Sequence, residues 1–250
     1  MGLYMHALLD ADIFLYEMGS ATDDEGYPLA WPLVQARLDA RIEQILEAVE
    51  AETWQGYITG QGNFRESIST IKDYKGNRDR GTRPFWHQAV HSYLVNDRSV
   101  IVCHGLEADD QISMDHGEGT IICSRDKDLK QVPGWHYSWP SWKQEEQRPY
   151  YITETDGLRF FYKQLLTGDA TDNILGLYGV GQKAACVQRI DTLEEEIDMF
   201  REVHEQYYLR FGNHWQMFMS ENGTLLWLLR HPEDSWHAKM QRLWKELNSE

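Results

Sequence analysis

Short apolar runs alternate with helical patterns through the first half of the chain. The runs at 3–9, 56–59, 99–103 and 120–123 are bounded by polar or glycine residues, which predicts buried strands. Between them, apolar residues recur at helical spacing, most clearly over 32–49. Strands that alternate with helices predict an α/β fold with a mainly parallel, twisted sheet flanked by helices.

The second half of the chain follows a different pattern. The aromatic-rich stretch 135–151 predicts a hairpin, and the pattern after it is helical. We therefore expect a core over 1–157 and a helical region over 158–250, with a basic, partly helical segment at about 64–84 inside the core. Tryptophans and leucines recur in 191–250, which we expect to extend a helical core; a partner-binding face is the alternative.

Charge is distributed unevenly along the chain. The formal net charge is −16, and a protein this acidic repels nucleic acid. Residues 65–83, however, carry six Lys or Arg against three Asp or Glu. The rest of the chain is more acidic still, and carboxylates that hold divalent cations no longer repel a phosphate. DNA therefore stays open as a partner.

Cysteine usage and the length of the apolar runs bear on the compartment. Cys103, Cys123 and Cys186 are far apart and form no C-x-x-C pair, which argues against a disulfide framework and a structural zinc site. Cys103 and Cys123 lie in apolar runs, so we expect buried strand cysteines. No apolar run approaches the roughly 20 residues of a membrane span. We expect a cytoplasmic protein without membrane contact.

Acidic residues gather just after three of the predicted strands. The carboxyl ends of parallel strands open onto one edge of a sheet, so these side chains are expected to lie together. Crowded carboxylates are costly unless cations neutralise them, and a cluster of oxygen donors suits Mg²⁺ or Mn²⁺. Two such ions about 4 Å apart activate a water and stabilise the leaving oxygen in phosphodiester cleavage. The residues are Asp10 and Asp12 after the first strand, Glu107, Asp109 and Asp110 after the third, and Asp126 and Asp128 after the next.

Single acidic residues in such places have a simpler explanation. An Asp after a strand is often the N-cap of the next helix, and this alternative stays open for Asp12. Glu107 and Asp110 are three residues apart and share a helix face, whereas Asp109 points partly elsewhere. Caps alone do not explain acidic groups after three strands, so a metal site is favoured.

The stretch LTGDATDNILGLYGVGQKAA, residues 166–185, combines acidic residues with glycines. Asp169 and Asp172 share a face if this part is helical. The glycines over 176–181 predict a hairpin between two helices, where backbone N–H groups can hold a phosphate beside Lys183. A glycine-rich connection without a ligand is the alternative.

Five short boxes together resemble the 5′-nuclease superfamily, which includes phage 5′→3′ exonucleases, flap endonucleases and the nuclease domain of bacterial DNA polymerase I. They occur in the family's order, and the resemblance extends from residue 3 to about 190. Five boxes in order are far more specific than any one of them. The boxes are LDAD at 9–12, YKGNR at 74–78, EADD at 107–110, SRDKD at 124–128, and GDATDN continuing to GVG at 168–181.

The resemblance implies a PIN-like α/β core with a short arch segment, followed by a helix-three-turn-helix region that binds DNA. It implies a 5′→3′ exonuclease or structure-specific flap endonuclease that uses two divalent cations, Mg²⁺ or Mn²⁺, with K⁺ at the glycine hairpin. The substrate would be DNA with 5′ ends or flaps, or an RNA–DNA hybrid. Such an enzyme would serve phage replication or recombination, including removal of RNA primers, in the cytoplasm of a bacterial host.

The site residues that the resemblance implies fall into three groups. Lys75 and Arg78 contact the scissile phosphate at the base of the arch, and Tyr74 stacks on a base. The residues that contact DNA are Arg65, Lys72, Arg80 and Arg83 of the basic segment and Gly179, Val180, Gly181 and Lys183 of the hairpin. The metal ligands are Asp10, Glu107, Asp109, Asp110, Asp126, Asp128, Asp169 and Asp172.

Two departures from the family pattern keep rival functions open. The family carries another acidic ligand after the second strand, whereas residues 58–62 (ITGQG) contain none. The segment 60–83 is also short for an arch. One rival is a PIN-type ribonuclease, which would not need residues 169–181. The other is a catalytically degenerate protein that binds branched DNA, which the missing acid favours.

Overall fold

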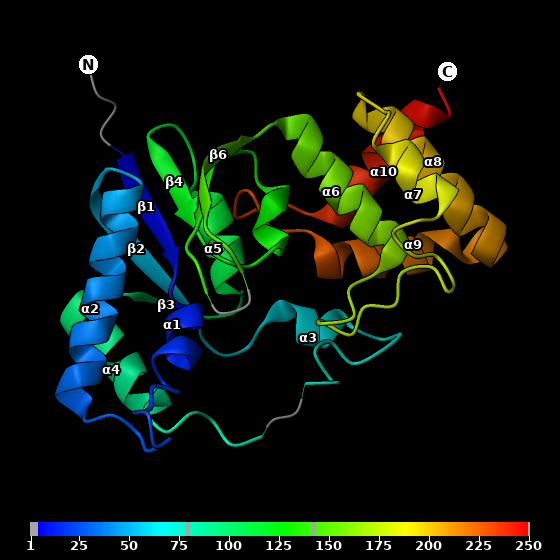
Figure 1. Cartoon of the computed structure of the whole chain (residues 1–250). Coiled ribbons are helices and arrows are strands. Elements are labelled where there is room, and N and C mark those ends of the chain that lie inside the picture. Colours follow the sequence, from blue (N-terminus) through cyan, green and yellow to red (C-terminus); the bar gives the residue numbers. More distant parts are fainter. Residues whose placement is uncertain (1–4, 79–80, 142–143, 250) are drawn as a thin grey trace. The chain divides into compact units, whose positions relative to one another are not determined.

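The computed structural model describes residues 5–78, 81–141 and 144–249, which form two compact units (Figure 1). Each unit has its own hydrophobic core. The predicted boundary after residue 157 lies close to the observed one, but the segment expected inside the catalytic core largely belongs to the other unit. The α/β unit is Met1–Gly62, Arg80–Leu129 and Gly134–Ile152; the helical unit is Asn63–Asp79, Lys130–Pro133 and Thr153–Glu250.

A six-stranded sheet in the order β3-β2-β1-β4-β5-β6 forms the centre of the α/β unit. All its neighbours pair in parallel except β5 and β6, which form the antiparallel hairpin that the sequence predicts. The α/β fold with a mostly parallel sheet is therefore confirmed. The strands are β1 (Met5–Asp10), β2 (Ala51–Thr59), β3 (Ile101–Cys103), β4 (Thr120–Cys123), β5 (Gly134–Ser138) and β6 (Gln147–Ile152).

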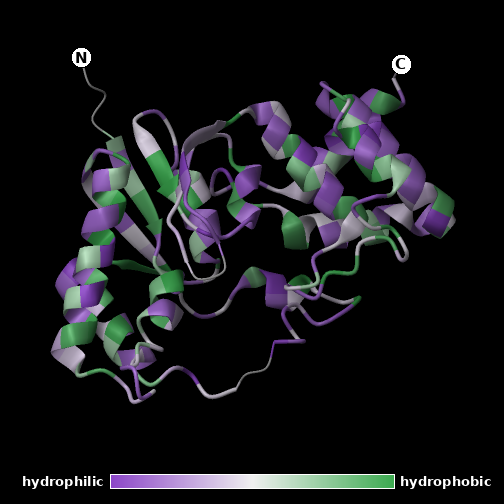
Figure 2. Ribbon diagram, in the orientation of Figure 1, coloured by the Kyte–Doolittle hydropathy of each residue, from purple (hydrophilic) through white to green (hydrophobic). Residues whose placement is uncertain are grey.

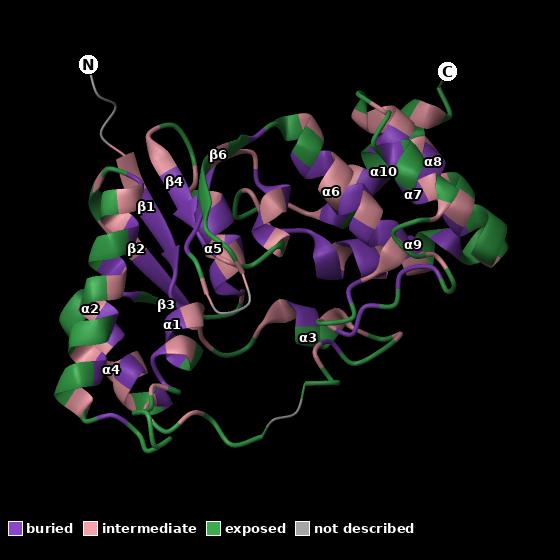
Figure 3. Ribbon diagram, viewed as in Figure 1, coloured by how far each residue is buried: buried purple, intermediate pink, exposed green. Residues whose placement is uncertain are grey.

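Helices cover both faces of this sheet because successive strand side chains alternate between the faces. Ala7 and Leu9 of β1 belong to the core that α1, α2 and α4 complete, whereas Tyr57 of β2 reaches α5 through a 2.6 Å hydrogen bond to Asp115. Figure 2 shows the apolar stripe of α2, and Figure 3 the buried strands. The helices are α1 (Asp12–Glu17), α2 (Trp31–Ala48), α4 (His87–Arg98) and α5 (Ala108–Asp115).

The helical unit packs around an aromatic core. Trp215, Trp227 and Trp236 are buried in it, which confirms that the tryptophan-rich tail extends a helical core. Phe161 meets both Trp227 and Trp236 edge to face. The helices are α3 (Phe64–Ile68), α6 (Glu154–Thr167), α7 (Ala185–Ile190), α8 (Glu196–Phe211), α9 (Trp215–Leu226) and α10 (Trp236–Leu247), with the 3₁₀ turn η2 (Gly212–His214). The 3₁₀ turn η1 (Asp128–Gln131) begins in the α/β unit and ends in the helical unit.

Several local expectations need adjustment. Helix α1 follows β1 after a single residue and was not predicted, because six residues are too few to show a helical period. Strand β2 begins at Ala51, earlier than its apolar part suggests. The basic segment is helical over Phe64–Ile68 and continues as bends and turns, because the backbone becomes extended at Ser69.

Two further expectations concern the cysteines and the membrane. Cys103 and Cys123 are buried in strands, as predicted, and burial raises the pKa of the Cys103 thiol to about 12. Across the described ranges, no helix combines the length and the apolar character needed to cross a bilayer.

Candidate active site

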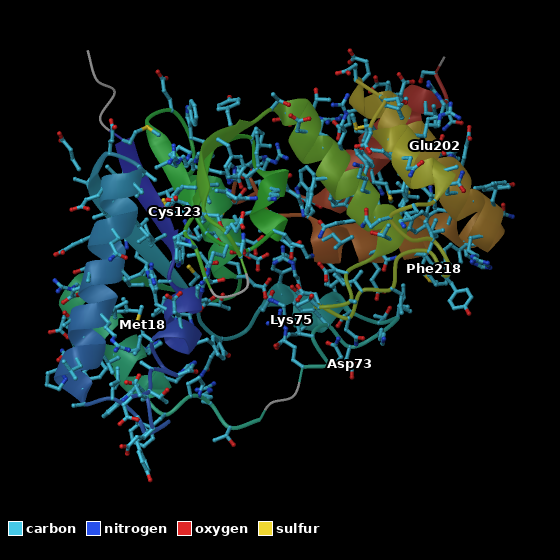
Figure 4. All side chains as sticks on the ribbon, viewed as in Figure 1. Met18, Asp73, Lys75, Cys123, Glu202 and Phe218 are labelled. Atoms are coloured by element: carbon cyan, nitrogen blue, oxygen red, sulfur yellow. The ribbon has the colours of Figure 1, made fainter. Side chains whose placement is uncertain are left out.

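The carboxyl-terminal edge of the parallel sheet in the α/β unit is strongly acidic. Strand β1 ends at Asp10, helix α5 begins beyond β3, and the loop after β4 supplies the remaining acids. Figure 4 labels Cys123, the last residue of β4. We name this group the acidic edge; it consists of Asp10, Asp12, Glu107, Asp109, Asp110, Asp126 and Asp128.

Hydrogen bonds connect two of the strands across this edge. The Ser124 hydroxyl donates to Asp10 Oδ2 at 2.8 Å, and the backbone N–H of Asp126 donates to that hydroxyl at 2.9 Å. The backbone N–H of Asp128 then donates to Asp126 Oδ1 at 2.9 Å. Asp10 is buried while Asp126 is exposed, so the edge runs from the interior to solvent.

The carboxylates of the acidic edge act on one another electrostatically. Burial raises the pKa of Asp10 to about 8, and the negative charges of Asp12 and Asp126 add to the shift. Burial likewise raises the pKa of Asp109 well above its usual value, with contributions from the charges of Asp10, Asp126, Glu107 and Asp128. Without a cation, part of this group therefore holds protons near neutral pH.

Glu107 and Asp110 begin helix α5 with a capping box. The Glu107 side chain accepts from the backbone N–H of Asp110, and Asp110 Oδ2 accepts from the Glu107 N–H at 3.1 Å. Both are buried. The helix cap and the predicted metal site therefore use the same two side chains. The two roles are compatible, because a carboxylate that accepts one N–H keeps lone pairs for other partners.

Asp12, for which capping was left open, does not cap α1. It is the first residue of that helix, and both its carboxylate oxygens lie 3.1 Å from the Thr59 N–H at the end of β2. The Thr59 hydroxyl in turn accepts from the N–H of Ala108. Asp12 thus connects the ends of β1 and β2, and its charge contributes to the raised pKa of Asp10.

The helical unit contains a second charged group, around Asp172. Arg78 Nη2 lies 2.6 Å from Asp172 Oδ1, the Tyr74 hydroxyl donates to Oδ2 at 2.9 Å, and Lys75 Nζ lies 3.7 Å from Oδ2. The Lys75 backbone N–H also donates to the Asp172 carbonyl at 2.9 Å. Lys75 stands on the turns after α3, where Figure 4 labels it. The YKGNR box and the acidic box at 168–173 thus form one local structure.

The segment that holds Asp169 and Asp172 is not helical. Asp169 pairs with Ile174 in an isolated antiparallel bridge, and Asp169 Oδ1 accepts the Thr171 N–H at 2.8 Å. The condition under which both acids would share a helix face is therefore not met, because helix α6 ends at Thr167 and Gly168 follows with a positive φ of 72°. Their part in a metal cluster stays a prediction.

Residues expected to contact DNA differ in exposure. Lys72 and Arg83 are exposed, and Arg80 lies outside the described residues. The Arg65 guanidinium is instead 1% exposed and donates to the carbonyls of Leu225 and Trp227, so its expected place on the DNA surface is wrong. The family resemblance implied a surface role for Arg65, whereas its guanidinium binds backbone carbonyls at the C-terminal end of α9, which the helix itself leaves without partners.

Tyr74 is also a core residue, with its ring 8% exposed. The Lys75 ammonium lies 4.9 Å from the centre of that ring, and the hydroxyl is bonded to Asp172. The ring therefore supports the position of Lys75 and has little free face for a base; base stacking stays a prediction.

The glycine hairpin connects α6 to α7 as predicted. Two of its glycines are required: a Cβ on Gly176 would lie 2.2 Å from the backbone nitrogen of Gly168, and Gly176 and Gly179 have φ of 57° and 79°. The tip exposes Tyr178, whose side chain is 87% exposed, together with Gly179, Gly181 and Lys183. Val180 instead packs partly into the core.

An arginine that sequence reasoning missed holds this hairpin. Arg210, in the last turn of α8, donates through Nη2 to the Tyr178 carbonyl, and its guanidinium lies 5.8 Å from the Tyr178 ring centre. The position shows no sequence signal, because Arg210 and Tyr178 are brought together by helix packing.

Several solved structures have a fold similar to that of this chain. The D15 protein of bacteriophage T5, crystallised with metal ions, matches with a TM-score of 0.62 and 16% identity over 98% of this chain and 97% of that one. A T5 D15 flap endonuclease complex with DNA and metal ions matches with a TM-score of 0.54 and 15% identity over 89% and 99%. The catalytic core of Rad2 with a DNA substrate matches with a TM-score of 0.51 and 13% identity over 100% and 91%.

These likenesses define the class of fold. The chain has the fold of the structure-specific 5′ nucleases, with a mixed, mostly parallel six-stranded sheet flanked by helices. No family model and no curated protein matches the sequence. The fold is thus shared with T5 D15 protein and Rad2, although few residues are identical.

Proposed function

We propose that this protein is a divalent-metal-dependent 5′ nuclease, a 5′→3′ exonuclease or flap endonuclease that hydrolyses DNA phosphodiesters. The observation that carries the proposal is the acidic edge. Its carboxylates converge from three parallel strands and raise one another's pKa, which is costly for a purely structural feature. The likeness in fold to a flap endonuclease complexed with DNA and metal ions supports the same function.

The donors of the acidic edge fit a hard cation. Among the described residues, no three Asp, Glu, His or Cys side chains stand ready as a metal cage. The acids are nevertheless all oxygen donors, and the raised pKa of Asp10 and Asp109 reflects a local excess of negative charge. The ligands would be Asp10, Glu107, Asp109, Asp110, Asp126 and Asp128. When bound, Mg²⁺ or Mn²⁺ supplies a polarised water and charge neutralisation for phosphodiester hydrolysis.

Lys75 and Arg78 would bind the scissile phosphate. Both are held by Asp172, so their cationic groups are oriented before a substrate arrives. The Arg78 side chain is half exposed, which leaves part of its guanidinium accessible to a phosphate oxygen. Cations aimed at the oxygen where charge develops accelerate the reaction more than they strengthen binding.

The glycine hairpin would bind the backbone of the duplex. Its exposed tip offers backbone N–H groups beside Lys183, and such contacts position DNA without reading its sequence. K⁺ at this hairpin, and a part in phage replication or recombination, follow from the family resemblance and belong to the same proposal.

Cleavage of a 5′-labelled flap duplex tests the function. Blunt duplex and single-stranded RNA are assayed beside it, each with Mg²⁺, Mn²⁺ or EDTA. We expect metal-dependent release of short DNA products, with product length separating exonuclease from flap cutting. Cleavage of RNA alone would establish the ribonuclease instead.

A DNA-binding protein without catalysis is the second candidate. The turn after β2 carries no acid, and its Gly60 N–H donates to the Cys103 carbonyl at 2.7 Å. Tight binding of flap DNA with no cleavage in either metal would support this function and overturn the nuclease.

A further inference from the structure

A cavity of about 590 Å³ lies in the α/β unit, outside the acidic edge. Its wall is formed by residues of helices α1 and α2, by Arg125, and by the chain beyond β5. Its volume lies within the range of roughly 300–1,000 Å³ that is usual for small-molecule sites. Its polar lining includes Glu17, Ser20, Arg41, Arg125 and Ser141, and Tyr16 contributes an aromatic ring.

Two arginines in this cavity share one carboxylate. Arg125 Nη2 lies 2.7 Å from Glu17 Oε2, and Arg41 Nε lies 3.2 Å from Glu17 Oε1. The three charges leave one net positive charge in the wall, within a chain whose formal charge is −16. A cationic cavity in so acidic a protein attracts a small anion.

The arginines are held in place and have donors to spare. The Arg125 guanidinium lies 5.2 Å from the ring centre of Trp139, which is buried and directs its indole N–H toward Glu17. Arg41 Nη1 donates to Gln44 at 3.2 Å, but its buried Nε makes no hydrogen bond with any described residue, despite its distance to Glu17. Each guanidinium carries five N–H donors, more than Glu17 and Gln44 accept.

We infer that this cavity binds a phosphomonoester attached to a nucleoside. A phosphate dianion is attracted by the excess positive charge and can accept hydrogen bonds from both guanidinium groups, whose planar forks match phosphate geometry. Ser20 and Ser141 line the same cavity. Tyr16, 60% exposed, offers a ring face on which a base stacks. The ligand is either a free mononucleotide or the phosphorylated terminal nucleotide of a strand.

Calorimetric titration of the full chain with 5′-dAMP tests this site. The titration is done in EDTA, so that it depends neither on metal nor on cleavage and its failure is separate from failure of the nuclease. We expect one dAMP per chain, weaker binding of inorganic phosphate, and no heat from deoxyadenosine. Deoxyadenosine binding as tightly as dAMP would overturn the inference.

Arg41→Gln is the test variant and Arg37→Gln its matched control. Arg37 lies on the same helix and is exposed, so the control makes the same charge change away from the cavity. We expect Arg41→Gln to weaken dAMP binding at least tenfold and the control to leave it within twofold. If both variants weakened dAMP binding equally, the loss would come from the change in net charge, and the proposed site would be overturned. Arg41→Lys keeps the positive charge but loses the planar guanidinium group. It is the more conservative change and is expected to fold, and it should also weaken dAMP binding.

Competition distinguishes the two sources of the ligand. A short single strand with and without a terminal phosphate is titrated against bound dAMP. Displacement that requires the terminal phosphate assigns the site to a strand end, and failure of both strands to displace dAMP assigns it to the free nucleotide. Absence of binding by dAMP and by both phosphorylated strands would overturn the inference.

Discussion

Carboxylates occur in opposite electrostatic settings in the two units. In the α/β unit, Asp10 and Asp109 lie among other acids, and their pKa values are raised. In the helical unit, Asp172 has Arg78, Lys75 and the Tyr74 hydroxyl as partners. The residue type is the same, so the environment decides what each carboxylate does.

The difference indicates which acids call for an external cation. An acid surrounded by acids is stabilised by a proton or a metal ion, whereas an acid paired with arginine and lysine is already neutralised within the protein. We therefore expect the acidic edge to bind metal without help from a protein cation. Asp172, whatever its part in a metal cluster, is expected to orient the side chains of Lys75 and Arg78.

Asp126→Asn gives the sharpest test of the acidic edge. Asp126 is exposed and raises the pKa of both Asp10 and Asp109, so its removal should preserve the fold and impair metal binding. We expect single-turnover flap cleavage to fall about a thousandfold, equal to roughly 4 kcal/mol of activation free energy. Binding of flap DNA in EDTA should stay within a few-fold. Asp97→Asn, an exposed acid on α4, is the control, and full activity of Asp126→Asn would refute the metal role.

Lys75→Gln tests the charged group around Asp172 in the helical unit. The variant removes a cation that Asp172 positions, and we expect single-turnover cleavage to slow about a hundredfold, or roughly 3 kcal/mol. Lys245→Gln, at an exposed site in α10, serves as the charge control. Circular dichroism and the melting temperature should match the parent protein. A loss of DNA affinity with an unchanged cleavage rate would make Lys75 a binding residue instead.

Metal and pH should act together on stability. The pKa of Asp10 is raised from 3.8 to about 8, so the folded state takes up a proton and, in EDTA, the free energy of unfolding falls as pH rises between these values. A cation on the acidic edge replaces that proton. Mg²⁺ should therefore raise Tm by several degrees at about pH 8 and by much less at about pH 5. Calorimetric scans at both pH values check this, and an equal Mg²⁺ effect at each would contradict it.

Arg210→Ala carries the smallest expected effect. The variant frees the hairpin tip, and we expect duplex affinity to weaken about five- to tenfold, roughly 1 kcal/mol, with the single-turnover rate at saturating DNA unchanged. Arg210→Lys should recover part of the affinity, since an ammonium can still donate to the Tyr178 carbonyl. Filter binding over a range of salt measures both variants. No change in affinity would show that the hairpin needs no such support.

Much of the α/β unit could be predicted from local pattern. Apolar runs and helical spacing located the strands and the longer helices, and the acids followed those strands closely in sequence. The carboxyl-terminal edge of a parallel sheet brings such acids together, which is why the sequence groups Asp10, Glu107 and Asp126. In the structure, the charges of all three raise the pKa of Asp109. Helix α1 was not predicted because six residues show no helical period. The assignment of residues 63–79 to the helical unit was not predicted because it depends on partners far away in the sequence.

The fold class, the acidic edge and the glycine hairpin could all be predicted from the sequence, because each depends on residue type at short spacing. Tertiary structure decided the partners of individual charges. Arg65 and Lys75 belong to one basic segment, yet one guanidinium is buried on α9 carbonyls and the other cation is held by Asp172. Arg41 and Arg125, far apart in the chain, meet at Glu17. A charge has no preferred partner until folding fixes which opposite charge lies within a few ångströms and how much water remains between them.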